Sequence, residues 1–340
     1  MSRFKTLTWL MEILPKKYKF YPSNSKISRK FALYFFIVMV NFVLIAVCII
    51  AGMIFKATKS IHPDAHKGIN TWILYLALPA VSFKYLPKVK WTTEMLFPIA
   101  ATFLISVFCF FFMMLYSKSK GYSRRSRSTL ELASGYSNTS FIGFPLISAF
   151  YGEGLLSIAI ICDQTMFFFL STLGIIAAVK GGSRSGKVSA LFILKRLVTF
   201  PPLIGCISAL VLSQFIDFTA AEPFFDKLAA TVSPLALFSV GLQLKFNGWK
   251  KLIPQMSMSM LYKLILAPAI VLGMALLFGI KGDVAKITVF EAAMPTLVTS
   301  SIIAEQFRLN TKLTNLIIGV SIIVGFFTSA FWYEMTEYFF

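Results

Sequence analysis

The sequence predicts an all-α integral membrane protein, and its composition and the spacing of its apolar runs support this prediction. Of the 340 residues, 57% are apolar and 14% are charged, and the mean hydropathy is +0.76. Soluble globular chains contain roughly 45–50% apolar and about 25% charged residues. This chain therefore has too little polar surface for a soluble fold, and it is too hydrophobic to be disordered.

Ten apolar segments follow one another along the chain, each close to the ~20 residues with which a helix crosses a bilayer. We expect helices because an open strand cannot satisfy its backbone hydrogen bonds in lipid. The segments lie at about 31–55, 68–86, 94–116, 129–150, 154–179, 191–213, 226–244, 252–279, 285–306 and 312–338. The fold class predicted is a bundle of ten transmembrane helices in a cell membrane, either the plasma membrane or a bacterial inner membrane.

A basic connection rich in glycine and serine, at 180–190, divides these spans into two sets of five. We therefore expect a first repeat at 31–179 and a second repeat at 191–340, after a basic N-terminal tail at 1–30. Five is an odd number, so the second repeat must enter the membrane from the opposite side. This arrangement is typical of inverted-repeat transporters.

Weak internal likeness supports the repeat. The second span contains LALPAVSF at Leu76–Phe83, and the seventh contains SPLALFSV at Ser233–Val240. Pro145 and Pro295 occupy the fourth and ninth spans, and proline interrupts a helix by removing a backbone donor. We expect helices four and nine to be discontinuous and to cross, with half-helix N-termini of roughly +0.5 charge each facing an anion. The alternative is that both prolines merely kink their helices.

Polar and ionisable residues within the apolar runs are the candidate functional groups, because such residues are costly in lipid and usually functional. Asp163, Glu291 and Lys263 are candidates for proton or ion coupling. A static hydrogen bond to a helix break is the alternative for Asp163, and an internal ion pair or snorkelling is the alternative for Lys263. Glu305 lies nearer a helix end, where we expect solvent or headgroups. The substrate-binding candidates are Asn138, Thr139, Pro145, Gln164, Pro295 and Thr296.

Other classes of function find little support in the sequence. The basic residues lie between apolar runs, which favours membrane flanks over nucleic-acid binding. Both histidines, His62 and His66, lie in one connection, so no histidine-based catalytic triad is expected in the membrane. Pro63 between them disfavours a helical metal site, and we expect neither a metal nor a cofactor.

The distribution of lysine and arginine predicts the orientation of the chain. The odd-numbered connections carry 18 of these residues and the even-numbered ones carry 6. The positive-inside rule thus places the odd connections in the cytoplasm and both termini outside. The basic tail, with eight further lysines and arginines, acts in the opposite direction.

The segment NTSFIGFPLISAFYGE at Asn138–Glu153, followed by Asp163 and Gln164, resembles the fourth and fifth spans of the auxin efflux carrier family. This family includes plant PIN carriers and bacterial carriers of malate- or malonate-like acids. Further segments resemble its second, seventh and ninth spans, and the likeness covers about 37–338; these segments are Leu76–Phe83, Ser233–Gly241 and Ala292–Phe307.

The resemblance implies a ten-span, five-plus-five inverted repeat with broken helices crossing at Pro145 and Pro295, and with both termini outside. It implies secondary transport of an organic anion by alternating access. Asn138 and Gln164 match polar positions of the substrate region. The short connection at 180–190 lacks the long loop of many plant members and is typical of the bacterial-like members.

We therefore predict a carrier of small organic acids, not an enzyme, whose partners are its substrate and the lipid bilayer. The alternatives are a sodium-coupled symporter of the bile-acid type, a membrane receptor that does not transport, and a membrane-embedded enzyme. The sequence leaves open the substrate, the coupling ion (a proton or Na⁺) and the oligomeric state, a homodimer included.

Overall fold

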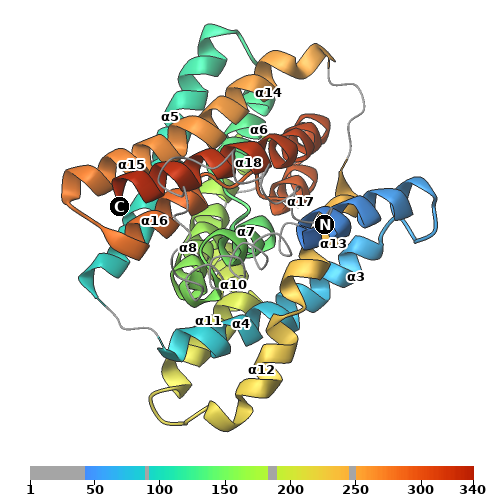
Figure 1. Ribbon diagram of the computed structural model, residues 1–340. Coiled ribbons are helices and arrows are strands. Elements are labelled where there is room, and N and C mark those ends of the chain that lie inside the picture. The colour runs from blue at the N-terminus through green and yellow to red at the C-terminus, as the bar shows by residue number, and fades with distance from the viewer. Residues whose placement is uncertain (1–42, 89–91, 183–189, 245–249) are drawn as a thin grey trace, which may run out of the picture. The chain divides into compact units, whose positions relative to one another are not determined.

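The computed structural model of the protein describes residues 43–88, 92–182, 190–244 and 250–340 (Figure 1). The predicted basic tail and the start of the predicted first span therefore lie outside the described residues. Within the described ranges the chain is helical and contains no strand, as the composition predicts. One isolated antiparallel bridge joins Ser137 to Thr296.

Among the described residues, five helical stretches are long and apolar enough to cross a membrane: Thr93–Ser119, Glu153–Gly181, Thr219–Gln243, Lys250–Phe278 and Thr311–Phe339. Three shorter apolar helices are Val43–Ala57, Thr139–Phe150 and Pro201–Leu212. The main elements are α3 (Ala65–Trp72), η2 (Ile73–Ala77), α4 (Leu78–Tyr85), α5 (Leu96–Ser119), α6 (Arg124–Gly135), η5 (Thr139–Gly143), α7 (Phe144–Phe150), α8 (Leu156–Phe169), η7 (Leu170–Gly174), α9 (Ile175–Gly181), α10 (Ala190–Val198), α11 (Pro201–Leu212), α12 (Glu222–Ala229), α13 (Val232–Gln243), α14 (Ile253–Met260), η10 (Leu261–Leu266), α15 (Ala267–Phe278), α16 (Gly282–Ala292), α17 (Thr299–Gln306) and α18 (Thr311–Phe339).

Two helices are interrupted in the middle of their apolar stretch. The first interruption is the segment 136–138 between α6 and η5, and the second is the segment 293–298 between α16 and α17. Pro295 lies inside the second interruption, as predicted. The prediction for Pro145 is wrong, because helical structure continues through it from Thr139 to Phe150 and the break lies before it.

A wider helical turn explains why Pro145 does not break its helix. The π-helical turns η2, η5 and η10 each end two residues before a proline, and these prolines are Pro79, Pro145 and Pro268. A proline ring clashes with the carbonyl one turn earlier and leaves it without a donor. A π-helical turn shifts the hydrogen bonds to the i→i+5 pattern, so the widened turn relieves this clash. Here the amide of Gly143 donates to the carbonyl of Asn138 at 3.0 Å.

The helices pack in two groups. In the first, which we call the scaffold group, α4 packs against α11 and α12, and α3 packs against α13. In the second, the crossover group, α5 packs against α6 and α8, while α16 packs against α15 and α18. Figure 1 shows α4, α11 and α12 together in the lower part of the view and α14, α15, α16 and α18 together in the upper part. The groups meet where α4 and α11 contact α8 and where α13 contacts η5.

One end of the described structure gathers the connections that follow α4, α7 and α11. Lys84 Nζ lies 3.2 Å from a carboxylate oxygen of Glu153 and 3.1 Å from one of Asp226. Lys88 pairs with Glu222 at 2.6 Å. These ion pairs bring three connections that are distant in sequence to the same end.

The remaining connections meet one another separately. Arg125 donates to the Leu309 carbonyl at 2.9 Å, and Tyr116 Oη donates to the Pro254 carbonyl at 3.1 Å. Lys56 Nζ donates to the carbonyl of Leu244. These contacts join the connections after the helix Val43–Ala57, α5, α13 and α17, and none of them involves the residues of the first set.

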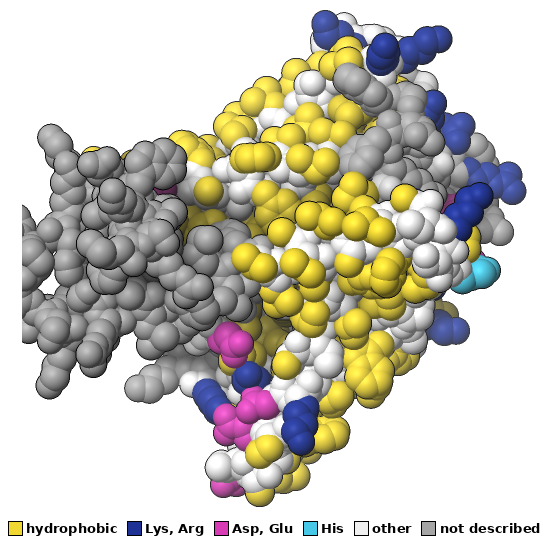
Figure 2. Space-filling model, turned by 45° about the vertical axis from the view of Figure 1, so that its right-hand side comes forward, with side chains coloured by type: hydrophobic (Ala, Val, Ile, Leu, Met, Phe, Trp, Pro, Cys, Tyr) yellow, Lys and Arg dark blue, Asp and Glu magenta, His cyan; other side chains and the backbone are white. Residues whose placement is uncertain are grey.

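Apolar side chains cover much of the exposed surface between the charged ends. Leu277 and Phe327 are 79% and 76% exposed. Figure 2 shows apolar side chains across the middle of the molecule, lysines and arginines along one edge, and a cluster of acidic and basic side chains at the lower end. A surface of this kind suits lipid rather than water.

We predict that Gly52→Ala destabilises the protein by about 1–3 kcal/mol, as overpacking does in tight interiors. Gly52 faces Gly241 of α13 so closely that a Cβ at position 52 would overlap the carbonyl oxygen of Phe238. Thermal unfolding in detergent measures the effect. The matched control is Gly273→Ala in α15, where a Cβ meets nothing within 4 Å. Equal melting temperatures for the two variants would contradict the close contact.

Candidate functional site

The two interrupted helices cross at their breaks and bond to each other through their main chains. The amide of Asn138 donates to the Pro295 carbonyl at 2.8 Å, and the amide of Leu297 donates to the Tyr136 carbonyl at 3.0 Å. These two bonds form the isolated bridge between Ser137 and Thr296. Backbone groups freed by a break must find partners inside protein when they lie at membrane depth, and here each break supplies partners for the other.

Side chains of the second break also satisfy the C-terminal end of α6. Thr296 Oγ1 donates to the Ala133 carbonyl at 2.8 Å, and Ser300 Oγ donates to the Leu132 carbonyl at 3.3 Å. The amide of Thr296 in turn donates to Ser321 Oγ at 3.1 Å. The predicted substrate residue Thr296 is thus fully buried, with both its hydroxyl and its amide already bonded.

A carboxylate lies at the start of the helical segment that follows the first break. Asp163, on α8, accepts a hydrogen bond from Thr139 Oγ1 at 2.5 Å and one from Gln164 Nε2 at 3.2 Å. Its side chain is buried, with 7% exposure. Thr139 is the first residue of η5, so the negative charge sits at a half-helix N-terminus, where the helix dipole favours it.

A lysine lies at the opposite kind of helix end. Lys263, in η10, is 1% exposed and donates to the carbonyl of Ala292, the last residue of α16, at 2.8 Å. It also donates to Ser137 Oγ in the first break at 2.5 Å. A cation at a helix C-terminus is favoured by the dipole, so Lys263 joins the two breaks through one positively charged group.

Within the part of the chain that the structure describes, two buried polar side chains at the crossover have no hydrogen-bond partner. They are the amide of Asn138, at both its oxygen and its nitrogen, and the carboxyl of Glu291, at both oxygens. Asn138 is fully buried and Glu291 is 2% exposed. The Glu291 carboxyl lies against Gly143, where a Cβ would overlap one of its oxygens. Buried polar groups without partners cost roughly 1–3 kcal/mol each, so these two side chains mark the place where a ligand would complete the site.

The space beside Glu291 is small. A cavity of about 10 Å³, lined by Thr139, Cys162, Thr288 and Glu291 among others, borders the carboxyl. A single water needs about 10–15 Å³, so this conformation leaves no room for an organic acid.

A second cavity, of about 220 Å³, is lined by Glu131, Tyr136 and Lys180. It reaches the first break at Tyr136.

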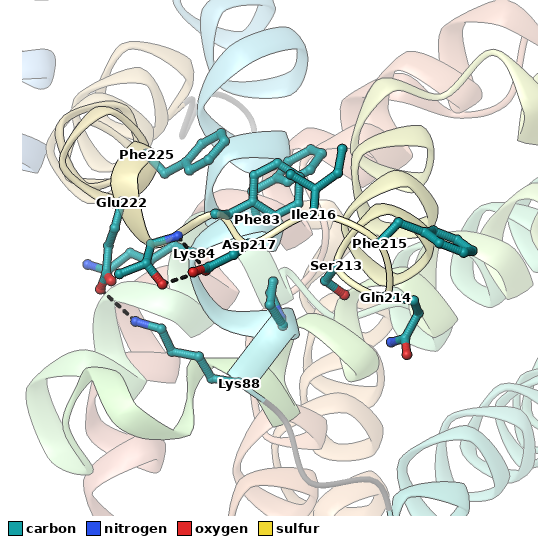
Figure 3. A pocket seen from close by; sticks show the side chains of 13 residues that line it. Phe83, Lys84, Lys88, Ser213, Gln214, Phe215, Ile216, Asp217, Glu222 and Phe225 are labelled. Carbon is teal, nitrogen blue, oxygen red and sulfur yellow. Dashed lines mark hydrogen bonds and ion pairs between the residues drawn. The ribbon is translucent and has the colours of Figure 1, made fainter.

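A third cavity, of about 460 Å³, lies at the ends of α4 and α11 and the start of α12 (Figure 3). The figure shows Lys88 paired with Glu222, and the ring of Phe83 beside that of Phe225. None of the predicted site residues lines this cavity. Its charged side chains Lys84, Lys88 and Glu222 are all in ion pairs, and the crossover remains the candidate site.

Comparison with known proteins assigns the chain to a family. The family model described as membrane transport protein matches residues 36–333. The chain belongs to this family. This confirms the resemblance to the auxin efflux carriers, and the chain is a multi-pass membrane protein.

Three curated relatives are similar to this member of the membrane transport protein family. An uncharacterized transporter of Methanocaldococcus jannaschii is 25% identical over 85% of this chain and 96% of its own length. An uncharacterized transporter of Methanothermobacter thermautotrophicus is 22% identical over 85% of this chain and 95% of its own length. A protein of Rhizobium meliloti named "Putative malonate transporter" is 27% identical over 72% of this chain and 79% of its own length.

In this transporter, most of the residues singled out from sequence lie at or beside the crossover. Asn138, Pro295 and Thr296 lie in the breaks, Thr139 begins η5, and Gln164 bonds Asp163. Pro145 lies beyond the break by about two helical turns. Sequence reasoning missed Ser137 and Gly143, which contact Lys263 and Glu291. Ser137 is the neighbour of Asn138, and Gly143 begins the Gly-Phe-Pro segment, so their positions in the sequence could have indicated them.

We predict that Thr139→Val lowers the free energy of unfolding by about 1.5–3 kcal/mol, because it removes a buried hydrogen bond to a charged group. Thermal unfolding in detergent measures the change. Thr172→Val is the matched control, because Thr172 Oγ1 bonds only carbonyls of its own helix; we expect less than about 0.5 kcal/mol there. A Thr139→Val protein as stable as the control would show that the Thr139–Asp163 bond contributes nothing.

Proposed function

We propose that the protein is a secondary carrier of small carboxylates that binds its substrate at the crossover and works by alternating access. The observation that carries this proposal is the side-chain amide of Asn138, which has no hydrogen-bond partner and is fully buried between two crossing helix breaks. Discontinuous helices near the bilayer midplane, with polar groups at their ends, are the usual binding place of secondary transporters.

The proposed topology is ten membrane crossings in two inverted sets of five. It is supported by the two separate sets of connections, one held by Lys84, Glu153 and Asp226 and the other by contacts such as Arg125 with Leu309. The proposed repeats contain residues 31–179 and 191–340. The odd connections, rich in lysine and arginine, would face the cytoplasm and the termini would face outside.

A carboxylate substrate suits the groups that the crossover leaves available. The Asn138 amide nitrogen can donate to a carboxylate oxygen, and the N-terminus of η5 attracts negative charge. Lys180 stands at the cavity that reaches Tyr136 and would attract anions from that side. The relative named as a malonate transporter makes malonate the first compound to test.

The boundary between the two groups of helices supports a motion of the crossover group against the scaffold group. Gly52 meets Gly241, and Gly205 meets Pro79, so close packing stiffens the scaffold group. Glu153, at the turn after α7, reaches the scaffold group through Lys84 and through Tyr85 Oη, at 3.2 and 2.8 Å. These bonds close one end, and opening that end requires that they break.

Asp163 is the leading candidate for coupling. Its carboxylate already holds the half-helix N-terminus that would attract the substrate, and two like charges repel strongly in a medium of low dielectric constant. Protonation of Asp163 would release Thr139 and Gln164 to donate to the substrate. Glu291, whose carboxyl has no donor, is the second candidate group.

We predict saturable uptake of radiolabelled malonate or a related dicarboxylate into proteoliposomes. Asn138→Ala should lower kcat/KM for uptake about tenfold or more, since a lost buried hydrogen bond costs about 1.4 kcal/mol or more. The control is Asn315→Ala, because Asn315 pairs with Ser301 of α17 and lies in neither break. Absence of saturable uptake of any dicarboxylate, or equal uptake by both variants, would contradict the proposal.

We also predict that uptake by the wild-type protein rises as the external pH falls, because protonation removes the negative charge that competes with the substrate. Asp163→Asn, which is neutral at every pH, should give uptake that does not follow pH. The exposed Asp283→Asn serves as the control. Uptake by Asp163→Asn with the wild-type pH profile would assign coupling to another group.

A further inference from the structure

We infer that the crossover contains a monovalent cation site of oxygen ligands, and that the ammonium group of Lys263 fills it in place of a bound metal ion. Lys263 Nζ lies 2.8 Å from the carbonyl oxygen of Ala292 and 2.5 Å from Ser137 Oγ. One oxygen belongs to a half-helix C-terminus and the other to the opposite break. This inference rests on the proposed function and specifies which cation the crossover uses.

The partners of Lys263 are the kind that bind a small cation. In transporters with broken helices, unwound carbonyls and half-helix C-termini coordinate Na⁺ or a proton. Here Ala292 ends α16, and its carbonyl has the partial negative charge of a helix C-terminus. An ammonium group on a flexible stem supplies one positive charge and three donors to such a site.

The segment that carries Lys263 is held firmly on both sides. Tyr262 Oη donates to the Ile105 carbonyl at 2.5 Å, and Trp332 Nε1 donates to the Leu264 carbonyl at 2.8 Å. Both bonds anchor the π-helical turn η10, in which the side chain sits. Tyr262 and Lys263 are among the largest fully buried side chains of the described residues. The cation is therefore attached to the fold and does not depend on an ion gradient.

The positive charge at the crossover comes from one of the two proposed repeats only. α5, the counterpart of Lys250–Phe278 in the proposed repeat, has its single lysine, Lys118, in its last turn. The second repeat thus supplies the cation, while Asp163 of the first repeat supplies the anion. A carrier with this arrangement has no place for Na⁺ between its breaks, so proton coupling replaces sodium coupling there.

Removal of the ammonium group tests the inference. Thermal unfolding of the purified full-length protein is compared in choline, sodium, potassium and ammonium chlorides at equal ionic strength. We expect the melting temperature of the wild-type protein to be the same in all four salts. Lys263→Ala leaves the oxygen ligands and an empty space, and sodium, potassium or ammonium should raise its melting temperature by about 2–4 °C over choline.

Two controls separate this effect from general salt effects. Lys263→Met fills the space with an apolar side chain and should not respond to the cation. Lys286→Ala removes a lysine that pairs with Glu337 away from the crossover, and it should behave like the wild-type protein.

A folded Lys263→Ala protein with one melting temperature in all four salts would overturn the inference, and so would saturable stabilisation of the wild-type protein by Na⁺. If Lys263→Ala does not fold, the wild-type comparison decides by itself: indifference to Na⁺ supports the inference and stabilisation overturns it. Because unfolding in detergent needs no transport, the result is independent of whether the protein carries dicarboxylates.

Discussion

The structure depends on one constraint: a helix interrupted inside a membrane must find partners for its free backbone groups and counter-charges for its new ends. Here each break bonds the other through Asn138 and Leu297. Asp163 lies at an N-terminal half-helix end, and Lys263 lies at a C-terminal one. The charges therefore follow the direction of the helix dipoles. Two charged side chains, each costly in lipid by itself, thus stabilise the ends of two broken helices.

The packing around the crossover follows from the same constraint. Side chains of the breaks need room, and glycines on neighbouring helices provide it. A Cβ at Gly174 would lie 3.1 Å from the ring of Tyr136, and one at Gly325 would lie 3.3 Å from Pro295. The π-helical turns contribute in another way, since they let prolines continue a helix and turn Lys263 toward both breaks. Gly143 is small enough to admit the Glu291 carboxyl.

Hydrogen bonding divides the buried polar side chains of the crossover into two kinds, those with partners and those without. Thr296, Ser300 and Lys263 have all their observed bonds within the protein and hold the crossing together. The side chains of Asn138 and Glu291 are equally buried but have no hydrogen-bond partner among the described residues. The candidate site thus consists of side chains whose hydrogen bonds hold the crossing together and of two side chains without hydrogen bonds. The cavity beside them is too small for a substrate in this conformation. Under the proposed function, binding would require that the crossover group and the scaffold group move apart.

The sequence by itself determined the membrane class, the helical segments, the family and most residues of the candidate site. Composition and the length of apolar runs decide these features, and Asp163, Glu291 and Lys263 are conspicuous because charge is costly in lipid. Sequence placed the first break at Pro145, whereas the structure has it at residues 136–138. Proline removes a hydrogen bond locally, but only the packing of the whole fold decides which turn opens. Tertiary structure alone decided that Lys263 binds Ser137 and Ala292, because these residues are 126 and 29 positions away in the chain.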